Sequence, residues 1–272
     1  MRTRPSPEVL AGYALSGERL EPLAGGQGSA WRAGSVILKP VGNQAEADWV
    51  AELLPTVREV GFRLSQPVRS TSGARTVAGW AAWRWLAGSH DFTGRWPQVL
   101  HAGAALHRAL AAVAEPAFLV DRDDHWSVAE RLSWAGELPA HQELRRPAER
   151  LAAFLRPTRR PSQLIHGDLT GNVLFADPAA PGIIDFTPYW RPASFGLAVV
   201  VADAVAWHGA GRPLLDAFGR HEPEESRSML ARAALFRLLT ADRVAAGSTD
   251  PACYLHSNAE AYSTVCTVLG VC

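Results

Sequence analysis

The sequence contains little cysteine and no long apolar run, and each absence limits what the chain can be. Its three cysteines form an odd number without metal-ligand spacing, and all lie near the C-terminus: Cys253, Cys266 and Cys272. We expect them to be reduced thiols. No uninterrupted apolar stretch is long enough to span a bilayer, and no apolar signal segment follows the charged N-terminal residues. We therefore expect a cytoplasmic protein with no membrane partner.

The sequence also lacks an excess of charge of either sign. Lys and Arg total 27, and Asp and Glu total 27, so no general field favours nucleic acid or a polycation as a partner. Hydrophobic residues make up 47% of the 272 positions, which excludes disorder and predicts one large domain or two lobes. With no internal repeat or long linker in view, we place the boundary at Gly88, between residues 1–88 and 89–272.

The first of these parts combines a glycine-rich turn with a strand that ends in a lysine. The turn contains Gly25, Gly26, Gln27, Gly28 and Ser29, and by itself it is most simply a β-hairpin turn. The apolar segment 35–40 follows and carries Lys39 near its end. In this order, the N–H groups of the loop can cover phosphates while the lysine reaches them from the next strand.

A helix is expected next, over residues 44–60, because apolar residues recur at helical spacing and Asn43 can cap its first turn. Pro55 is expected to kink it or end it early. If this helix packs on the lysine strand, one of its acids can orient Lys39. Glu46 is the first choice and Glu52 the second, and a solvated helix face is the simpler interpretation of either.

Two antiparallel strands are predicted over 67–70 and 76–86, around a turn at 72–73. Trp83 and Trp85 share one face of the second strand, where an aromatic wall can stack on a base, although ordinary core packing explains each of them more readily. Beyond Gly88 the periodicity becomes helical. We predict helices over 96–113, 141–155, 194–208, 212–220, 223–246 and 252–269, and an acidic surface loop at 121–125.

A strand-like run at 163–165 delivers the segment His166-Gly167-Asp168, and Asn172 follows four positions after the aspartate. Asp168 can accept a proton from a hydroxyl that attacks a phosphoryl group. Asn172 offers a neutral oxygen to a hard cation such as Mg²⁺. His166 is better suited to brace the loop. Taken alone, His-Gly-Asp is a weak signal, because a simple turn explains it equally well.

A second apolar run, residues 182–184, ends at Asp185, which can hold a metal ion that bridges phosphates. The ordered set is far more specific than any single member, because a glycine loop, Lys39 and Glu46 precede Asp168, Asn172 and Asp185 in the order that a phosphate-handling site requires.

In these residues the chain resembles the aminoglycoside phosphotransferase-like branch of the protein-kinase-like superfamily, which includes choline, homoserine and fructosamine kinases. The resemblance implies an α+β fold with a small antiparallel-sheet lobe before a larger, mostly helical lobe, and it implies ATP and Mg²⁺ as cofactors. It also implies that Lys39 contacts the α- and β-phosphates with Glu46 as its helix partner, that Asp168 is the catalytic base and that Asn172 and Asp185 bind metal. The hinge that reads adenine would comprise Trp83, Arg84 and Trp85.

The chain departs from the family pattern at three places. The loop from Asp168 to Asn172 is one residue shorter than usual, the glycine loop is not a full Gly-x-Gly-x-x-Gly, and the pair Gly-Asp after the metal aspartate is replaced by residues 187–192. An acid that braces the catalytic loop can instead be Asp203. These departures suggest an outlying subfamily, and the runs Asp-Leu-Thr-Gly-Asn and Pro-Tyr-Trp-Arg-Pro resemble an actinobacterial group.

The sequence thus predicts a kinase that phosphorylates a hydroxyl of a small molecule. Arginines outnumber acids between 226 and 247, which does not favour a polycationic antibiotic as the acceptor, and residues 189–191 are candidates for gripping the acceptor or for packing under a loop. The shortened loop and the irregular glycine loop keep open an alternative, a nucleotide-binding pseudokinase with a regulatory role. A purely structural protein would require the ordered acids to be coincidence.

Overall fold

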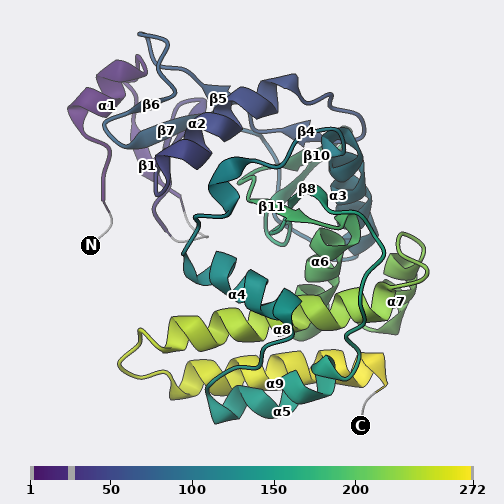
Figure 1. Ribbon diagram of the computed structural model, residues 1–272. Helices are drawn as coiled ribbons and strands as arrows, with labels where there is room; N and C mark the ends of the chain where they lie inside the picture. The colour runs from purple at the N-terminus through teal and green to yellow at the C-terminus, as the bar shows by residue number, and fades with distance from the viewer. Residues whose placement is uncertain (1–2, 24–27, 271–272) are drawn as a thin grey trace. The chain divides into compact units, whose positions relative to one another are not determined.

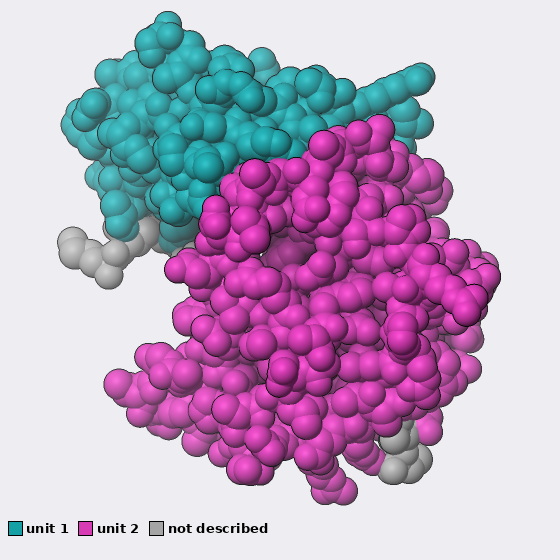
Figure 2. Space-filling model, viewed as in Figure 1, with its two compact units in different colours: residues 1–90, 174–186 teal, residues 91–173, 187–272 magenta. Residues whose placement is uncertain are grey.

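The structure is a computed structural model that describes residues 3–23 and 28–270. Residues 1–90 and 174–186 form unit 1, and residues 91–173 and 187–272 form unit 2 (Figure 2). The sequence places a boundary at Gly88, close to the first division. The structure differs in that a later segment, 174–186, returns to the first unit.

Unit 1 is built on an antiparallel sheet in the order β1-β2-β3-β7-β5, with β6 also pairing β7. Its helices and first strands are α1 (Pro7–Gly12), β1 (Leu20–Pro22), β2 (Trp31–Ala33), β3 (Val36–Pro40), α2 (Gln44–Leu53), β5 (Pro67–Val68), β6 (Thr76–Val77) and β7 (Trp80–Arg84) (Figure 1). Apolar residues of α1, β2, β3 and β7 form one core, where the Tyr13 hydroxyl donates to the Trp80 carbonyl oxygen at 2.9 Å.

A smaller sheet explains why residues 174–186 belong to unit 1. Strand β10 (Ala179–Ile183) lies between β9 (Val173–Ala176) and β4 (Arg63–Leu64), and it pairs with β4 in parallel. Ser89 and Phe175 also exchange two backbone hydrogen bonds, of 2.8 and 3.0 Å. Such long-range pairings leave no signature in the local sequence pattern, so the boundary predicted from the sequence does not include them.

The helix expected over 44–60 is shorter than the periodicity suggested. Helix α2 ends at Leu53, and a 3₁₀ turn, η1 (Leu54–Thr56), contains Pro55. A proline ring obstructs the preceding helical turn, which accounts for the early end. At the other end, the expected cap is confirmed, because the Asn43 side chain accepts a hydrogen bond from the Glu46 N–H at 3.1 Å.

Unit 2 is mostly helical. It contains α3 (Trp96–Leu110), η2 (Ala117–Leu119), α4 (His125–Ala135), α5 (Gln142–Ala152), α6 (Ala193–His208), α7 (Arg212–Gly219), α8 (Ser226–Ala245) and α9 (Ala252–Leu269) (Figure 1). Helix α6 is buried from Ser194 to Val205, as befits a helix that is apolar on every side. It packs against α3, α8 and α9, so it forms the centre of the unit. Among the described helices, none is long and apolar enough to cross a membrane.

Helix α4 is absent from the sequence prediction, which treats residues 121–125 only as a surface loop. Asp124 is the N-cap of this helix, with its side chain accepting from the Ser127 N–H at 2.9 Å. Gly136 ends the helix in the left-handed conformation. The acidic loop therefore starts a helix, and Asp124 also pairs with Arg122. The free thiols Cys253 and Cys266 agree with the expected reduced state, while Cys272 lies outside the described residues.

Candidate active site

In unit 1, Lys39 forms an ion pair with Asp185. Lys39 lies on β3 opposite Ala81 of β7, and Asp185 follows the end of β10 with a positive φ of 53°. Few residues other than glycine adopt this backbone conformation, and such strained positions concentrate at functional sites. Burial lowers the pKa of the Lys39 ammonium to about 8, while the adjacent carboxylate of Asp185 favours the charged form. Lys39 is also the only lysine in the sequence.

The glycine loop lies between β1 and β2, which pair antiparallel. Three of its predicted phosphate-binding positions lie outside the described residues: Gly25, Gly26 and Gln27. Gly28 is described and has a φ of 68°, a conformation that suits glycine, and Ser29 follows it. The Leu23 N–H donates to the Ala30 carbonyl oxygen at 3.0 Å and closes the base of the turn. Its contact with phosphates stays a prediction.

Glu46, the predicted partner of Lys39, is the third residue of α2. The ion pair that the structure gives to Lys39 is with Asp185, so the orienting role of Glu46 stays a prediction. Glu52, the second choice, pairs with Arg75.

The predicted hinge residues lie at the end of β7, and their backbone groups are already engaged. The Arg84 N–H donates to the Gln66 carbonyl oxygen at 2.8 Å, and the Trp85 N–H donates to Ser35 at 2.9 Å. Trp83 pairs with Ile37 in the sheet. The ring of Trp85 is covered by the Arg32 guanidinium at 4.3 Å. Adenine recognition by these three residues stays a prediction.

In unit 2, the loop that carries Asp168 is held by two buried histidines. It leaves β8 (Gln163–His166), which pairs antiparallel with β11 (Pro188–Arg191). His166 Nδ1 accepts from the Asp168 N–H at 3.2 Å and from the Thr187 N–H at 3.4 Å. The His166 N–H donates to His107 Nε2 at 3.2 Å, and His107 Nδ1 donates to the Ala193 carbonyl oxygen at 3.0 Å. His166 thus lies where a bracing residue is expected.

Burial, together with the neighbouring His166, lowers the pKa of His107 to about 3, so His107 is neutral. Two glycines allow this close packing. A Cβ at Gly167 would lie 2.2 Å from the Tyr189 ring, and one at Gly196 would lie 2.7 Å from the His166 carbonyl oxygen. The loop can therefore approach α6 and β11 only with glycine at these positions.

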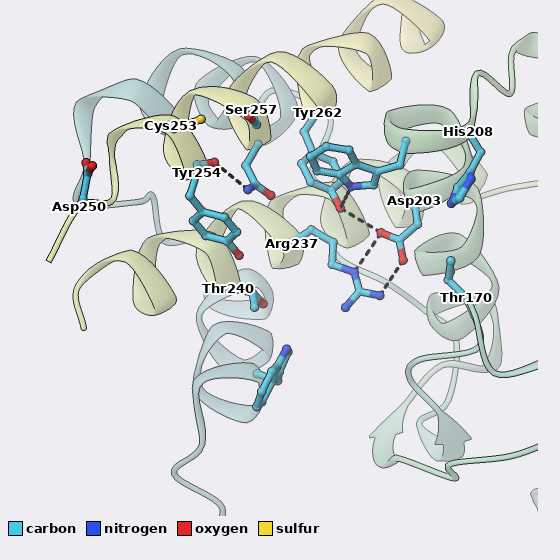
Figure 3. Close-up of a pocket in the computed structure, with 13 residues that line it drawn as sticks. Thr170, Asp203, His208, Arg237, Thr240, Asp250, Cys253, Tyr254, Ser257 and Tyr262 are labelled. Atoms are coloured by element: carbon cyan, nitrogen blue, oxygen red, sulfur yellow. Dashed lines mark hydrogen bonds and ion pairs between the residues drawn. The ribbon is translucent and has the colours of Figure 1, made fainter. Parts of the chain in front are cut away.

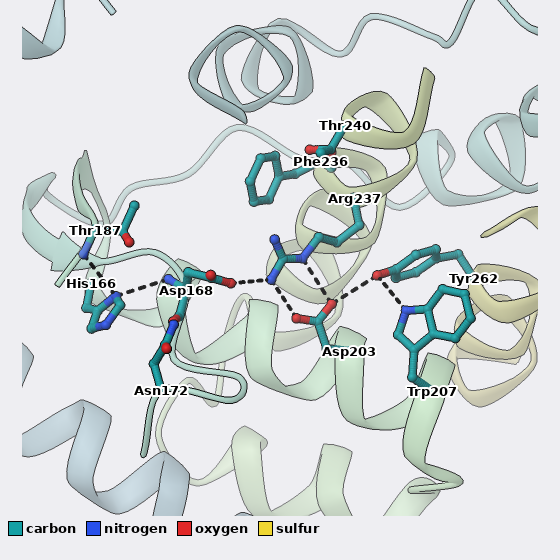
Figure 4. A network of polar contacts seen from close by, with 10 residues as sticks. All are labelled: His166, Asp168, Asn172, Thr187, Asp203, Trp207, Phe236, Arg237, Thr240 and Tyr262. Carbon is teal, nitrogen blue, oxygen red and sulfur yellow. Dashed lines mark hydrogen bonds and ion pairs between the residues drawn. The ribbon is translucent and has the colours of Figure 1, made fainter. Parts of the chain in front are cut away.

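The side chain of Asp168 is bound by an arginine from α8. Arg237 Nη2 lies 2.7 Å from Asp168 Oδ1 and 2.6 Å from Asp203 Oδ2, and its Nε donates to Asp203 Oδ1 at 3.0 Å (Figure 4). The Tyr262 hydroxyl donates to Asp203 at 3.0 Å, and Trp207 Nε1 donates to the Tyr262 hydroxyl at 3.2 Å. The expected brace, Asp203, is thus linked to Asp168 through Arg237.

This chain of contacts leaves one oxygen of the candidate base open. Asp168 Oδ1 is held by Arg237, and Oδ2 accepts no hydrogen bond from a described residue. The Asp168 side chain is 42% exposed, whereas Asp203 and Arg237 are largely buried. Burial alone would lower the pKa of Arg237, but the carboxylates of Asp203 and Asp168 outweigh it and raise that pKa well above its ordinary value. The arginine stays charged and holds one face of the carboxylate.

Asn172, the predicted metal ligand of the shortened loop, also contacts the loop itself. Its Nδ2 donates to the Asp168 carbonyl oxygen at 2.7 Å, and Gly171 before it has a φ of 80°. Its Oδ1 is then the end of the amide suited to a cation. Asn172 belongs to unit 2 and Asp185 to unit 1.

Two of the residues predicted to bind the acceptor, Tyr189 and Arg191, make contacts inside unit 2. Tyr189 is 5% exposed, and burial raises the pKa of its hydroxyl. Arg191 makes a two-point ion pair with the buried Glu130 of α4 and lies over the Trp134 ring. These contacts join β11 to α4, and they favour the packing interpretation of this segment.

A cavity of about 760 Å³ lies on unit 2, next to the arginine that holds Asp168 (Figure 3). Its lining comes from the catalytic loop, from α4, α6, α8 and α9, and from the segment between α8 and α9: Trp126, Thr170, Asp203, Trp207, His208, Arg237, Thr240, Asp250, Cys253, Tyr254, Ser257, Asn258 and Tyr262. Cavities of this size hold small ligands. Arg237, which lines the pocket, donates a hydrogen bond to Asp168, the candidate base.

Sequence reasoning missed Arg237 and His107 as members of the site. Both were visible, Arg237 in a run of arginines between 226 and 247 and His107 beside an apolar stripe, but nothing local distinguishes them from their neighbours. Lys39 is different, because it is the only lysine in the sequence and its residue type alone distinguishes it.

Comparison with known proteins bears on the identity of this site. Residues 20–236 match the model of the phosphotransferase enzyme family, APH. A search of curated proteins found no match.

Solved structures share the fold at low sequence identity. Spectinomycin phosphotransferase APH(9)-Ia, in complex with ADP and spectinomycin, has 12% identity and a TM-score of 0.65, with 97% of each chain covered. A choline/ethanolamine kinase family protein from Mesorhizobium loti has 17% identity and a TM-score of 0.58, with 96% of each chain covered. Choline kinase LicA from Streptococcus pneumoniae has 11% identity and a TM-score of 0.58, covering 90% of this chain and 94% of its own.

These likenesses confirm the α+β, protein-kinase-like fold class expected from the sequence. The family match spans more than half of the chain and includes the glycine loop, Lys39, Asp168, Asn172 and Asp185. The chain belongs to the APH phosphotransferase enzyme family.

Proposed function

We propose that this protein transfers the γ-phosphoryl group of ATP to a hydroxyl of a small molecule. The observation that carries the proposal is the state of Asp168, whose Oδ1 is held by Arg237 while Oδ2 is open. Arg237 itself lines a pocket large enough for a small ligand. A fixed carboxylate in this position can orient a hydroxyl and accept its proton.

The Lys39 and Asp185 pair suits the nucleotide part of this function. A partly buried ammonium next to a carboxylate provides one positive group for phosphate oxygens and one hard oxygen ligand for a cation. Asn172 Oδ1 adds a neutral oxygen ligand of the same kind. Mg²⁺, when bound, would neutralise charge on the phosphates, and the carboxylate of Asp185 and the amide oxygen of Asn172 are each ligands of the kind that this ion takes.

The chain's own residues then divide the work. Lys39 binds and neutralises phosphate oxygens, and backbone N–H groups of the glycine loop are the further donors that we propose for them. Asp168 orients the acceptor hydroxyl and takes its proton on Oδ2. Phosphoryl transfer passes through a loose transition state, so positioning contributes more than a strong base does. A carboxylate positioned by an arginine is adequate for that task.

A non-catalytic regulator is the weaker alternative. It is favoured by the shortened catalytic loop and the irregular glycine loop, yet Lys39, Asp168 and Asp185 are all present, and each has a charged partner. A protein that uses ATP on a small metabolite would be expected to act in the cytoplasm, where both are available.

The direct test is Asp168→Asn in the full chain. We expect ATP turnover with an accepted small molecule to fall by about 10³-fold or more, since general-base and positioning effects of this size are common. Nucleotide binding, measured as the thermal shift caused by ATP and Mg²⁺, should change little. Turnover by Asp168→Asn equal to that of the parent protein would exclude Asp168 as the base.

A further inference from the structure

Most of the exposed large apolar side chains among the described residues line the pocket on unit 2. Five such side chains are more than a third exposed, and three of them line this one cavity: Trp126 at 37%, Trp207 at 49% and Tyr254 at 42%. They come from α4, α6 and α9. Single exposed apolar side chains are common on protein surfaces, but several exposed aromatic rings that line one cavity are typical of a ligand-binding site.

One of these rings is held in a fixed orientation. Trp207 Nε1 donates to the Tyr262 hydroxyl at 3.2 Å, and the two rings meet edge to face with centroids 6.1 Å apart. Tyr262 is in turn anchored to Asp203. Trp207 is therefore half-exposed yet positioned by the same polar chain that holds Asp168. A preorganised aromatic surface costs a ligand little ordering on binding.

The charges in the pocket are already balanced. Asp203 receives two hydrogen bonds from Arg237 and one from Tyr262, and Arg237 serves two carboxylates. Among the charged residues that line the pocket within the described chain, Asp250 alone has no ion pair, and it is exposed. A polycation needs several unpaired carboxylates, and an anion needs an unpaired cation. The lining provides neither set.

The remaining polar groups suit hydroxyls. Arg237 Nη1 makes no hydrogen bond to a described residue, so this edge of the guanidinium can donate without adding net charge. Asn258 donates through Nδ2 to the Tyr254 carbonyl oxygen at 2.8 Å, which leaves its Oδ1 as an acceptor. Ser257 lines the same wall (Figure 3). Donors and acceptors beside aromatic rings match a molecule with apolar ring faces and a rim of hydroxyls.

Resting on the phosphotransferase function proposed above, we propose that this pocket binds the acceptor and that the acceptor is an uncharged, ring-shaped polyhydroxy compound of the sugar or cyclitol class. Trp207, Trp126 and Tyr254 cover its ring faces, and Arg237 and Asn258 bind its hydroxyls. One hydroxyl faces Asp168. Its oxygen forms the new bond to the γ-phosphorus of ATP, the bond from that phosphorus to the bridging oxygen breaks, ADP leaves, and the proton passes to Asp168.

The test uses the full chain and a panel of small probes observed by ligand-detected saturation-transfer NMR. Methyl α-D-glucopyranoside, D-galactose, D-ribose and myo-inositol represent the neutral class. Kanamycin and spermidine represent polycations, choline represents single cations, and citrate and D-glycerate represent anions. We expect at least one neutral ring to bind more tightly than every charged probe.

Two pocket variants and one matched control locate the binding. Tyr254→Ala and Trp126→Ala should each weaken the neutral probe by about tenfold, because each removes a stacking surface. Val120→Ala removes an apolar side chain that is 79% exposed and outside the pocket, and it should leave binding unchanged. The inference would be overturned if only charged probes bind, or if both pocket variants bind the neutral probe as tightly as the parent protein does.

ATP affinity, measured by calorimetry in the same samples, separates this inference from the function on which it rests. Loss of ATP binding together with retained neutral-ring binding would remove the proposed phosphotransferase and keep the ligand class of the pocket. Retained ATP binding and Asp168-dependent ATP turnover, with no neutral ring bound, would remove only the ligand class.

Discussion

Arg237 Nη2 lies 2.7 Å from Asp168 Oδ1, so the candidate catalytic carboxylate is tied to a helix that begins 58 positions later in the chain (168 to 226). The same guanidinium grips the buried Asp203. The orientation of Asp168 therefore does not depend on its own loop alone. Substitution of Arg237 removes this contact without altering the candidate base itself.

Arg237→Gln should lower turnover, with a larger effect on kcat than on the KM for ATP. The glutamine cannot hold Asp168 and Asp203 together, and the buried Asp203 loses its positive partner. The loss of such a pair costs about 3–5 kcal/mol of the free energy of unfolding, so stability is measured alongside by urea denaturation. Basal ATP hydrolysis, with water as the acceptor, provides the kinetic readout.

Arg237→Lys distinguishes positioning from charge alone. Lysine keeps the positive charge but lacks the planar fork, so it can hold one carboxylate at a time, and partial recovery of kcat is expected. Arg212→Gln, on an exposed pair with Asp216, is the matched control and should change neither rate nor stability. Full activity in Arg237→Gln would show that Asp168 is oriented by its loop alone.

Lys39→Met should weaken ATP binding by about tenfold or more, because a charged hydrogen bond to phosphate oxygens is lost. Calorimetry with the full chain measures the change, and Arg19→Met, at a side chain that is 88% exposed, is the control in the same unit.

The single lysine also allows a chemical test. An amine-reactive ATP analogue can modify only Lys39 and the N-terminal amine, and excess ATP should protect Lys39 alone. Equal labelling of Lys39 with and without ATP would place the nucleotide elsewhere.

Stability should fall as the pH is lowered from 6.5, in part because of His107. Its pKa is about 3 in the folded protein against 6.5 ordinarily, so between these values the unfolded chain binds a proton that the folded protein does not. The free energy of unfolding then decreases by about 1.4 kcal/mol per pH unit within that window from this group.

Urea denaturation at pH 7.0, 6.0 and 5.0 measures that slope, and His107→Gln isolates the contribution. The variant should be less stable at pH 7 because the hydrogen bonds to His166 and Ala193 are altered, yet its stability should depend less on pH. Parallel profiles for the two proteins would show that His107 takes up no proton on unfolding.

Gly196→Ala should destabilise the protein by about 1–3 kcal/mol and reduce turnover. The added Cβ would lie 2.7 Å from the His166 carbonyl oxygen and 2.8 Å from the His107 ring, so α6 or the catalytic loop must shift. Gly219→Ala, where a Cβ meets nothing within 4 Å, is the control and should be neutral or slightly stabilising. Thermal denaturation of both variants compares them, and equal midpoints would mean that the loop adjusts freely.

Tyr262→Phe should raise the KM for the acceptor more than it lowers kcat. The phenylalanine keeps the ring but removes the hydroxyl that joins Asp203 to Trp207, so Trp207 loses its fixed orientation at the pocket wall. A stability loss of about 1 kcal/mol is expected for the lost hydrogen bonds. Steady-state kinetics and tryptophan fluorescence follow the two effects, and an unchanged KM would separate Trp207 from acceptor binding.

Much of the fold could be predicted because it depends on local patterns. The periodicity of α3, α6, α8 and α9 indicated their extents to within a few residues, since buried faces recur along a helix regardless of its partners. The family, too, followed from short motifs in order. Helix α4 was missed because its start was interpreted as a surface loop, and α2 was overextended because apolar spacing continued past Pro55.

The identities of the candidate phosphate, base and metal residues were determined by the sequence alone, because each motif places its chemistry within a few consecutive positions, as around Asp168. Only the tertiary structure decided that Arg237, rather than another arginine of the same helix, holds Asp168, and that Asp185 is the ion-pair partner of Lys39. Such contacts depend on how a helix is rotated in its packing and on which strands pair, and no local pattern encodes either.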